Sequence, residues 1–167
     1  NVSAGIDVGS SNSKANIRNS IFYGAQKTSG LKCGKDICVT SGCTANIDYC
    51  LFEENSTACI SGAGTINKGS NNVFGDPRFV RAITANEIAS IMVNNGSYYG
   101  YAADAYEKVF SKANVHARNR KLTVDTGDPA SPYSNEPSPN GERVNLGYYG
   151  NTPEALSSAV GMLFFVR

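Results

Sequence analysis

The chain has no tryptophan, a single histidine and almost no excess of charge of either sign. Lys and Arg total 15 and Asp and Glu total 14, so the formal net charge is +1. Such a balance provides no general attraction to nucleic acid or to an acidic membrane surface. The longest apolar run, Gly161 to Val166, is far too short to span a bilayer. We therefore expect no nucleic-acid partner and no membrane span, and any partner must be recognised through local features.

The cysteines lack the spacing of a metal or redox site. None of them forms a Cys-x-x-Cys pair, and His116 is the only histidine, so the pattern matches no zinc ribbon, c-type haem site or thioredoxin-like motif. We expect some thiols to stack as small apolar residues and others to form one or two disulfides, which leaves one cysteine unpaired within the chain. The disulfide candidates are Cys33, Cys38, Cys43, Cys50 and Cys59.

An internal repeat organises the first half of the sequence. Residues 14–22 read KANIRNSIF and residues 44–52 read TANIDYCLF, so Ala, Asn, Ile and Phe recur in register. A third, shorter copy follows, with Val73-Phe74 in the place of Leu51-Phe52. Each copy has apolar residues two apart between Gly, Ser and Asn, which is a strand-and-turn pattern. One copy cannot bury its own apolar side chains, so identical positions of successive copies must stack.

Stacking of this kind predicts a mainly β fold, a right-handed parallel β-helix of about three coils. Side chains at equivalent positions should then touch, with the apolar ones in a continuous core and the asparagines in an amide ladder at a turn. The expected neighbours are Ile6 and Ile37, Val8 and Val39, Ile17 and Ile47, Phe22 and Phe52, Ile37 and Ile60, and Asn16 and Asn46.

Catalytic groups are sparse on these coils. Arg18 and Asp48 occupy equivalent repeat positions, so we expect an ion pair between adjacent coils. Glu53 and Glu54 are neighbours in sequence, and adjacent strand residues point to opposite sides, which does not suit acid/base hydrolysis. The chain also lacks a Gly-x-Ser-x-Gly motif and a phosphate-binding Gly-Lys-Ser/Thr loop. We predict no catalytic residue here, and an active face, if the parent protein has one, on coils upstream of Asn1.

Residues 82–114 change from strand to helix pattern. Thr84 and Glu87 have the spacing of a capping box, and Ile88, Ile91 and Met92 follow at helical intervals. A second helix is predicted within 102–112, with Ala105, Tyr106, Val109 and Phe110 on one stripe. We expect both helices to pack on one flank of the coils. The candidates for carbohydrate binding are tyrosines that link the two helices and arginines of the alternating segment after them, namely Tyr98, Tyr99, Tyr101, Arg118 and Arg120. The alternative for the tyrosines is half-buried packing against the coils, and the alternative for the arginines is a solvated strand face.

The most specific motif begins at Val124 and reads VDTGDPASPYSNEPSPNGERVNLGYYGNTPEA. It resembles the closing segment of bacterial secreted or cell-surface right-handed parallel β-helix repeat proteins, of the choice-of-anchor type, in which IDAGDP precedes NGxRxNxGAYG. Residues 19–22, NSIF, and 75–80, GDPRFV, resemble further elements of the same proteins. Thr126 and Tyr148 depart from the pattern, in which small Ala is common. The resemblance implies a secreted or cell-surface location and says little about activity.

Within this motif, Asp125, Asp128 and Arg143 are predicted to form a Pro/Gly-rich cap over the C-terminal end of the coils. Arg143 is suited to a carboxylate, with Asp125 or Asp128 as its partner. A calcium site is the competing interpretation, because oxygen-rich turns supply the ligands that Ca²⁺ needs. Its candidate ligands are Asp125, Asp128, Asn135, Glu136 and Asn140, in a spacing that matches no known calcium loop. We expect no cofactor, with Ca²⁺ as the weak alternative.

We divide the chain into coils at 1–81, a helical insertion at 82–114, and final strands with the cap at 115–167, together one continuous domain of a longer chain. The leading functional hypothesis is an extracellular or cell-surface module for adhesion, glycan contact or assembly, without its own catalytic centre. One alternative is the C-terminal part of a polysaccharide lyase or glycoside hydrolase of β-helix fold. Another is a self-assembling fibre subunit, because a first coil beginning near Val2 leaves a strand edge open to head-to-tail association.

Overall fold

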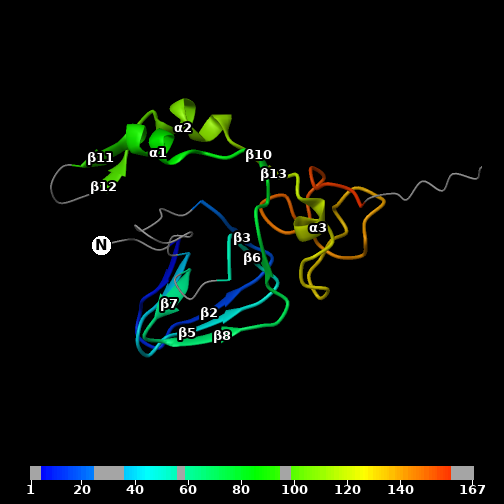
Figure 1. Cartoon of the computed structure of the whole chain (residues 1–167), viewed down its shortest axis with the longest axis horizontal. Helices are drawn as coiled ribbons and strands as arrows, with labels where there is room; N and C mark the ends of the chain where they lie inside the picture. The colour runs from blue at the N-terminus through cyan, green and yellow to red at the C-terminus, as the bar shows by residue number, and fades with distance from the viewer. Residues whose placement is uncertain (1–4, 25–35, 56–58, 95–98, 159–167) are drawn as a thin grey trace, which may run out of the picture.

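The computed structural model describes residues 5–24, 36–55, 59–94 and 99–158. Its first half is mainly β and contains three parallel three-stranded sheets, in the orders β1-β4-β7, β2-β5-β8 and β3-β6-β9 (Figure 1). Each sheet takes one strand from each of three successive stretches of chain, which we name the first, second and third coil. The strands are β1 (Ile6–Val8), β2 (Lys14–Ile17), β3 (Ile21–Phe22), β4 (Ile37–Val39), β5 (Thr44–Ile47), β6 (Leu51–Phe52), β7 (Ile60–Gly62), β8 (Thr65–Lys68) and β9 (Val73–Phe74).

The pairing register between coils is the one that the repeat predicts. Ile17 pairs with Ile47 and Phe22 with Phe52, so the two long copies align residue for residue. The shorter third copy continues the same columns, since Ile37 pairs with Ile60. Parallel pairing in register places like side chains on the same face, because strand side chains alternate with a period of two.

The core lies inside the coils and is built from these columns. Buried residues of all three coils form one apolar cluster, which includes Ile37, Ile47 and Phe52. The rings of Phe22 and Phe52 stack with centroids 4.9 Å apart and 4° between their planes. Stacked aromatic and aliphatic columns therefore supply the burial that one coil could not achieve alone.

The cysteine prediction holds in part. Cys43 and Cys50 are free thiols buried in the same cluster, as expected for small apolar residues, and Cys38 is a half-buried free thiol. The prediction of a disulfide is thus wrong for each of these three residues. Cys33 lies outside the described residues, so a bridge involving Cys33 or Cys59 stays a prediction.

An amide ladder follows the outer face of the β2-β5-β8 sheet. Asn46 Nδ2 donates to Asn16 Oδ1 at 2.9 Å, and Asn67 Nδ2 donates to Asn46 Oδ1 at 2.8 Å. The ladder runs through strands instead of the expected turn, and it includes a third residue, Asn67, that the repeat had not been used to predict. The expected ion pair between Arg18 and Asp48 is wrong, because Arg18 pairs with a distant carboxylate and Asp48 accepts hydrogen bonds from its own neighbours.

The remaining elements follow the third coil. They are β10 (Phe79–Arg81), α1 (Ala85–Ile91), β11 (Met92–Asn94), β12 (Tyr99–Tyr101), α2 (Ala105–Lys108), a 3-10 helix η1 (Phe110–Lys112), β13 (Asn114–Ala117) and α3 (Arg120–Thr123). β10 pairs with β13 and β11 with β12, both antiparallel. Figure 1 shows α1, α2, β11 and β12 grouped together and joined to the rest through the β10–β13 pair. Packing of this group on the flank of the coils stays a prediction.

The capping box at α1 is confirmed. Glu87 N–H donates to Thr84 Oγ1 at 3.3 Å, and Thr84 N–H donates to Glu87 Oε2 at 2.9 Å. The helix ends at Ile91, so Met92 is wrongly included and belongs to β11. The second helix is shorter than expected and leaves Tyr106 66% exposed, off the buried stripe. Ala105 and Val109 are buried and join Ile91 in a small second core.

The final segment, described over residues 115–158, contacts the coils along one corner. Asn119 donates to the Asp76 and Pro77 carbonyls just after the third coil. Farther along, Gly147 N–H donates to the Asn19 carbonyl of the first coil at 2.8 Å. Alternation predicts a strand over 115–124, but β13 ends at Ala117 and α3 follows. These described contacts lie along the side of the coils, and a cap over their C-terminal end stays a prediction.

Truncation of Ile47, which is 1% exposed in the middle coil, should test the column core. We expect Ile47→Ala to lower the free energy of unfolding by about 2 to 5 kcal/mol, measured by urea denaturation, because it leaves a cavity among stacked side chains. The control Val80→Ala removes a side chain that is 40% exposed, and it should change stability by less than about 0.5 kcal/mol. Equal losses in the two variants would contradict a core centred on the second coil.

Candidate functional site

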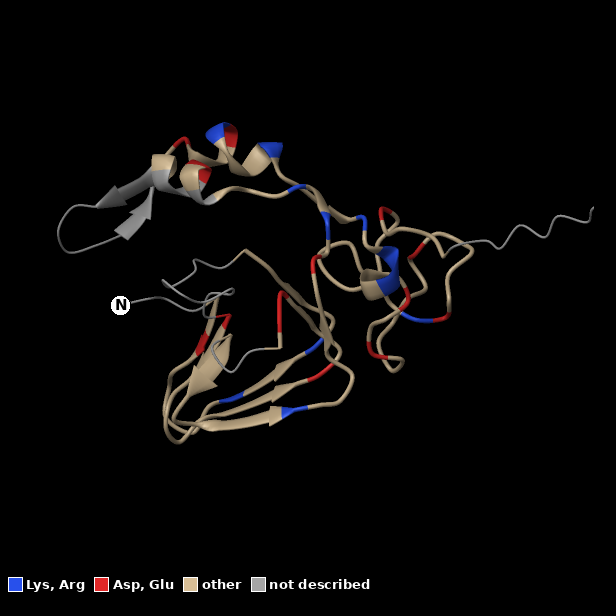
Figure 2. Ribbon diagram, viewed as in Figure 1, with Lys and Arg blue, Asp and Glu red and all other residues tan. Residues whose placement is uncertain are grey.

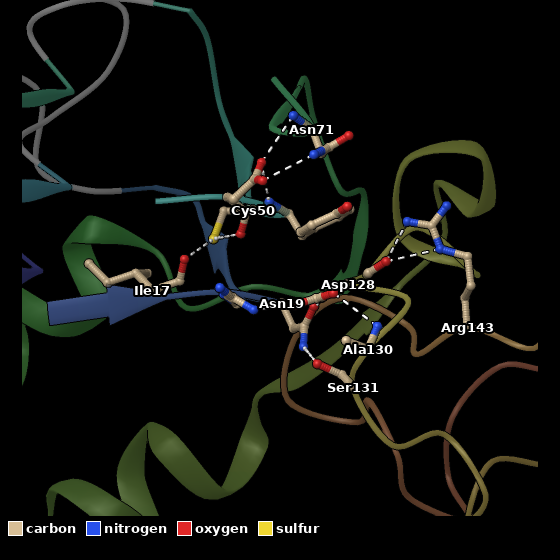
Figure 3. Close-up of polar contacts among 12 residues, drawn as sticks. Ile17, Asn19, Cys50, Asn71, Asp128, Ala130, Ser131 and Arg143 are labelled. Atoms are coloured by element: carbon tan, nitrogen blue, oxygen red, sulfur yellow. Dashed lines mark hydrogen bonds and ion pairs between the residues drawn. The ribbon is translucent and has the colours of Figure 1, made fainter. Parts of the chain in front are cut away.

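The final segment meets the first coil at a polar junction centred on Asn19 (Figure 3). Asn19 adopts a left-handed conformation with φ of 54°, which asparagine tolerates better than most residues. This conformation accompanies side-chain bonds to two distant residues: Asn19 Nδ2 donates to Ser131 Oγ at 2.8 Å, and Asp128 N–H donates to Asn19 Oδ1 at 2.7 Å. The corner of the first coil is thereby fixed to the loop of the final segment.

Asp128 adds an ion pair to this junction. Its Oδ2 lies 2.5 Å from Nη1 of Arg18, and the carboxylate side chain is only 7% exposed. The hydrogen bond from Ala130 N–H, followed by the bond and charge of Arg18, lowers the pKa of Asp128, and the charge of Arg143 acts in the same direction. Asp128 is therefore held ionised as a structural anchor between residues far apart in sequence.

Arg143 does not bind a carboxylate, so the predicted pairing with Asp125 or Asp128 is wrong. Its Nε donates to the Gly127 carbonyl at 3.0 Å and its Nη2 to the Thr126 carbonyl at 3.2 Å. The guanidinium also lies 5.7 Å from the centre of the Tyr49 ring. The planar fork is satisfied by main-chain carbonyls, and it touches the second coil through an aromatic face.

Next to the junction lies a groove of about 500 Å³ between the first coil, the β10–β13 pair and the final segment. Its lining is mostly apolar, with the polar side chains of Asn19 and Ser20, and contains no charged side chain. The lining residues are Asn19, Ser20, Ile21, Phe79, Val115, Gly147 and Tyr148. A concave apolar surface with few polar groups is the usual form of a small-ligand site.

Tyr148 is the most exposed aromatic residue of this groove. Its side chain is 81% exposed, yet its ring packs edge-on against Tyr149 with centroids 5.1 Å apart. Tyr149 in turn stacks on His116 at 3.7 Å, and the His116 ring nitrogens lie 2.8 Å from Asn114 Oδ1 and 3.1 Å from the Glu154 carbonyl. This series of contacts supports the Tyr148 ring while leaving it available to a ligand.

The carbohydrate-binding residues predicted from sequence do not form one site. Tyr98 lies outside the described residues, and Tyr99 and Tyr101 belong to β12. Arg118 and Arg120 follow β13, and Arg120 donates to the Ser157 carbonyl. Figure 1 shows β12 and α3 in separate parts of the molecule, so the tyrosines and the arginines are not brought together.

The weak calcium candidates already have protein partners. Asp125 Oδ1 and Oδ2 accept from Gly141 N–H and Ser158 Oγ. Glu136 Oε1 accepts from the backbone N–H groups of Asn145 and Asn151, both at 2.8 Å. In the part of the chain that the structure describes, no group of three or more His, Cys, Asp or Glu side chains is placed to hold a metal ion. Figure 2 shows both acidic and basic residues in the coils, in the α1–α2 group and in the final segment.

Asp36 is an unusual carboxyl at the start of β4. It is 3% exposed, and its Oδ2 is buried without a hydrogen-bond partner. Burial, together with the charge of Glu53, raises the pKa of Asp36 to about 6. Ionisation of this side chain above that pH therefore opposes folding of the coils.

A pH series should detect this penalty. Because the folded pKa of about 6 exceeds the ordinary value of 3.8, the native state binds more protons than the unfolded state between these values. The free energy of unfolding should fall as pH rises from about 4 to above 6, by about 3 kcal/mol at most. Asp36→Asn should remove this slope in urea titrations, whereas Asp7→Asn, on the exposed surface of the first coil, should keep it. An unchanged slope in Asp36→Asn would contradict the assignment.

Arg143→Ala should weaken the attachment of the final segment. Loss of charge-assisted bonds to two carbonyls predicts a decrease in the free energy of unfolding of about 1 to 3 kcal/mol, seen as a lower melting temperature. Arg118→Ala is the matched control, since Arg118 is exposed. If both variants have the melting temperature of the parent chain and show no added aggregation, Arg143 has no role in attaching the final segment.

The groove could not be predicted from the sequence because its residues come from four segments that are distant along the chain. Three of these segments nevertheless fall in motifs of the sequence: NSIF holds Ile21, GDPRFV holds Phe79 and NLGYYG holds Tyr148. Tyr148 is also a position where the chain departs from the resembling pattern. A departure toward a large aromatic residue was the available signal.

Comparison with protein-family models, curated proteins and solved structures finds no match for this chain. Among the described residues, no helix has the length and apolar character needed to cross a membrane. The function must therefore be inferred from the groove and from the coils themselves.

Proposed function

We propose that this chain is an extracellular or cell-surface module of right-handed parallel β-helix fold that binds a neutral glycan in the groove beside Asn19. The observation that carries the proposal is the Tyr148 ring, 81% exposed at the groove and supported from behind by Tyr149. The β-helix part is supported by three parallel sheets that each take one strand from every coil in the same order.

The chemistry of the groove suits a sugar. Pyranose rings present apolar C–H faces and hydroxyl edges, and amphipathic aromatic rings such as tyrosine match the first of these. Ile21, Phe79 and Val115 extend the apolar surface. Asn19 keeps a second amide hydrogen beyond the one donated to Ser131, and the Ser20 hydroxyl retains acceptor capacity. The absence of charged side chains from the lining favours a neutral ligand over an acidic one.

The module acts without its own catalytic centre in this proposal. The charge of Glu53 contributes to the raised pKa of Asp36, but Asp36 is buried within the coils, away from a dissolved polymer. The alternative is the C-terminal part of a polysaccharide lyase or glycoside hydrolase. Incubation of the chain with neutral and acidic polysaccharides, with and without Ca²⁺, distinguishes the two, because release of products above a heat-inactivated control would require an enzyme.

Binding should depend on Tyr148. In affinity electrophoresis through gels containing soluble xylan, β-glucan or mannan, we expect the parent chain to be retarded by at least one polymer. Tyr148→Ala should weaken that binding about tenfold, which corresponds to about 1.4 kcal/mol, the value of a good aromatic contact. Tyr106→Ala is the matched control, because Tyr106 is 66% exposed on α2 and does not line the groove.

Three results would contradict the proposal. They are a parent chain that no neutral polymer retards, a parent chain that pectate alone retards, and equal binding by Tyr148→Ala and Tyr106→Ala. Because Tyr148 is exposed, its truncation should leave the melting temperature unchanged, so loss of binding is not loss of folding.

A further inference from the structure

Among the described strands, the coil stack has two edges. Within the described residues, β1, β2 and β3 lie at one edge of their sheets, and β7, β8 and β9 lie at the opposite edge. Strands at a sheet edge carry unpaired N–H and C=O groups that can pair with another chain. The two edges present different residues, so their hydrogen-bonding groups and apolar side chains can be compared for complementarity.

The amide ladder has a direction that makes its ends complementary. Asn46 donates to Asn16, and Asn67 donates to Asn46. An amide offers both a donor and an acceptor, so the ladder leaves an Nδ2 donor at Asn16 and an Oδ1 acceptor at Asn67. If a second copy were placed below the third coil in the same register, its Asn16 would donate to Asn67 as another rung.

The apolar columns fit the same arrangement. Phe74, at the third-coil edge, is 40% exposed, and its ring lies 6.4 Å from that of Phe52. A cavity of about 220 Å³ lies at this end and is lined by residues of the second and third coils, including Ile60 and Phe74. The first-coil edge presents Ile6 and Phe22, the residues that already occupy these two columns above the second coil.

We propose that the third-coil edge of one molecule binds the first-coil edge of a second copy of this chain, with Asn67 against Asn16 and Phe74 against Phe22. Each contact leaves one free edge of each kind, so association is heterologous and continues as a linear stack. The inference uses the coils alone and does not depend on glycan binding at the groove.

The variant Asn16→Asp tests the proposal without breaking the ladder inside the molecule. A carboxylate oxygen at residue 16 still accepts the bond from Asn46, but it cannot donate to Asn67 of a neighbouring copy and meets its amide oxygen instead. Sedimentation velocity over a range of concentrations should show a series of growing species for the parent chain. Asn16→Asp should associate about tenfold more weakly or worse. Asn135→Asp, the same change at an exposed position away from both edges, should behave as the parent.

Mixing supplies a second, sharper test. Thr65→Lys places a charge on the third-coil edge opposite Lys14 of an incoming copy, so it blocks the other end. At a concentration where each variant alone is monomeric, an equimolar mixture should form dimers and nothing larger, because one intact edge of each kind remains. A parent chain that stays monomeric, one that stops at a closed dimer, or single variants that assemble like the parent would each overturn the proposal.

Discussion

In-register stacking of like residues between parallel strands is the constraint on which the rest of this structure depends. Ile over Ile, Phe over Phe and Asn over Asn repeat from coil to coil, so the core and the outer surface share one periodicity. A single coil has too little apolar surface to be stable, and the columns make each coil a template for the next. The same register also fixes the positions of the turns that connect the strands of neighbouring coils.

Residues that recur at equivalent positions could be predicted from the sequence with their partners. The pairing of Asn16 with Asn46 and of Phe22 with Phe52 follows from the alignment of two copies, because parallel strands preserve register. Arg18 and Asp48 show where this reasoning fails. They occupy equivalent positions, yet Arg18 extends to Asp128, which comes from a segment with no repeat to locate it.

The candidate site was hidden for the same physical reason. Its residues are joined by side-chain and main-chain bonds between irregular segments, such as those of Asn19 with Asp128 and Gly147. Periodicity predicts which strands are neighbours, but it carries no information about where a loop of positive-φ residues and prolines will lie. The local capping box at Thr84 was predictable, whereas the helical spacing of 102–112 did not predict that α2 would end at Lys108 and be followed by the 3-10 helix η1.

The final segment also fixes how many coils lie between its own points of attachment. It touches residues after the third coil through Asn119, the second coil through Arg143, and the first coil through Gly147. Inserting one more coil between these attachment points would preserve every column, yet it would increase the distance between them by about 4.8 Å, the spacing of neighbouring strands. Phe79 and Ile21 would then no longer face the same groove. The contacts of the final segment along the side of the coils therefore permit one number of coils between Asn19 and Asp76, although the repeat itself would allow others.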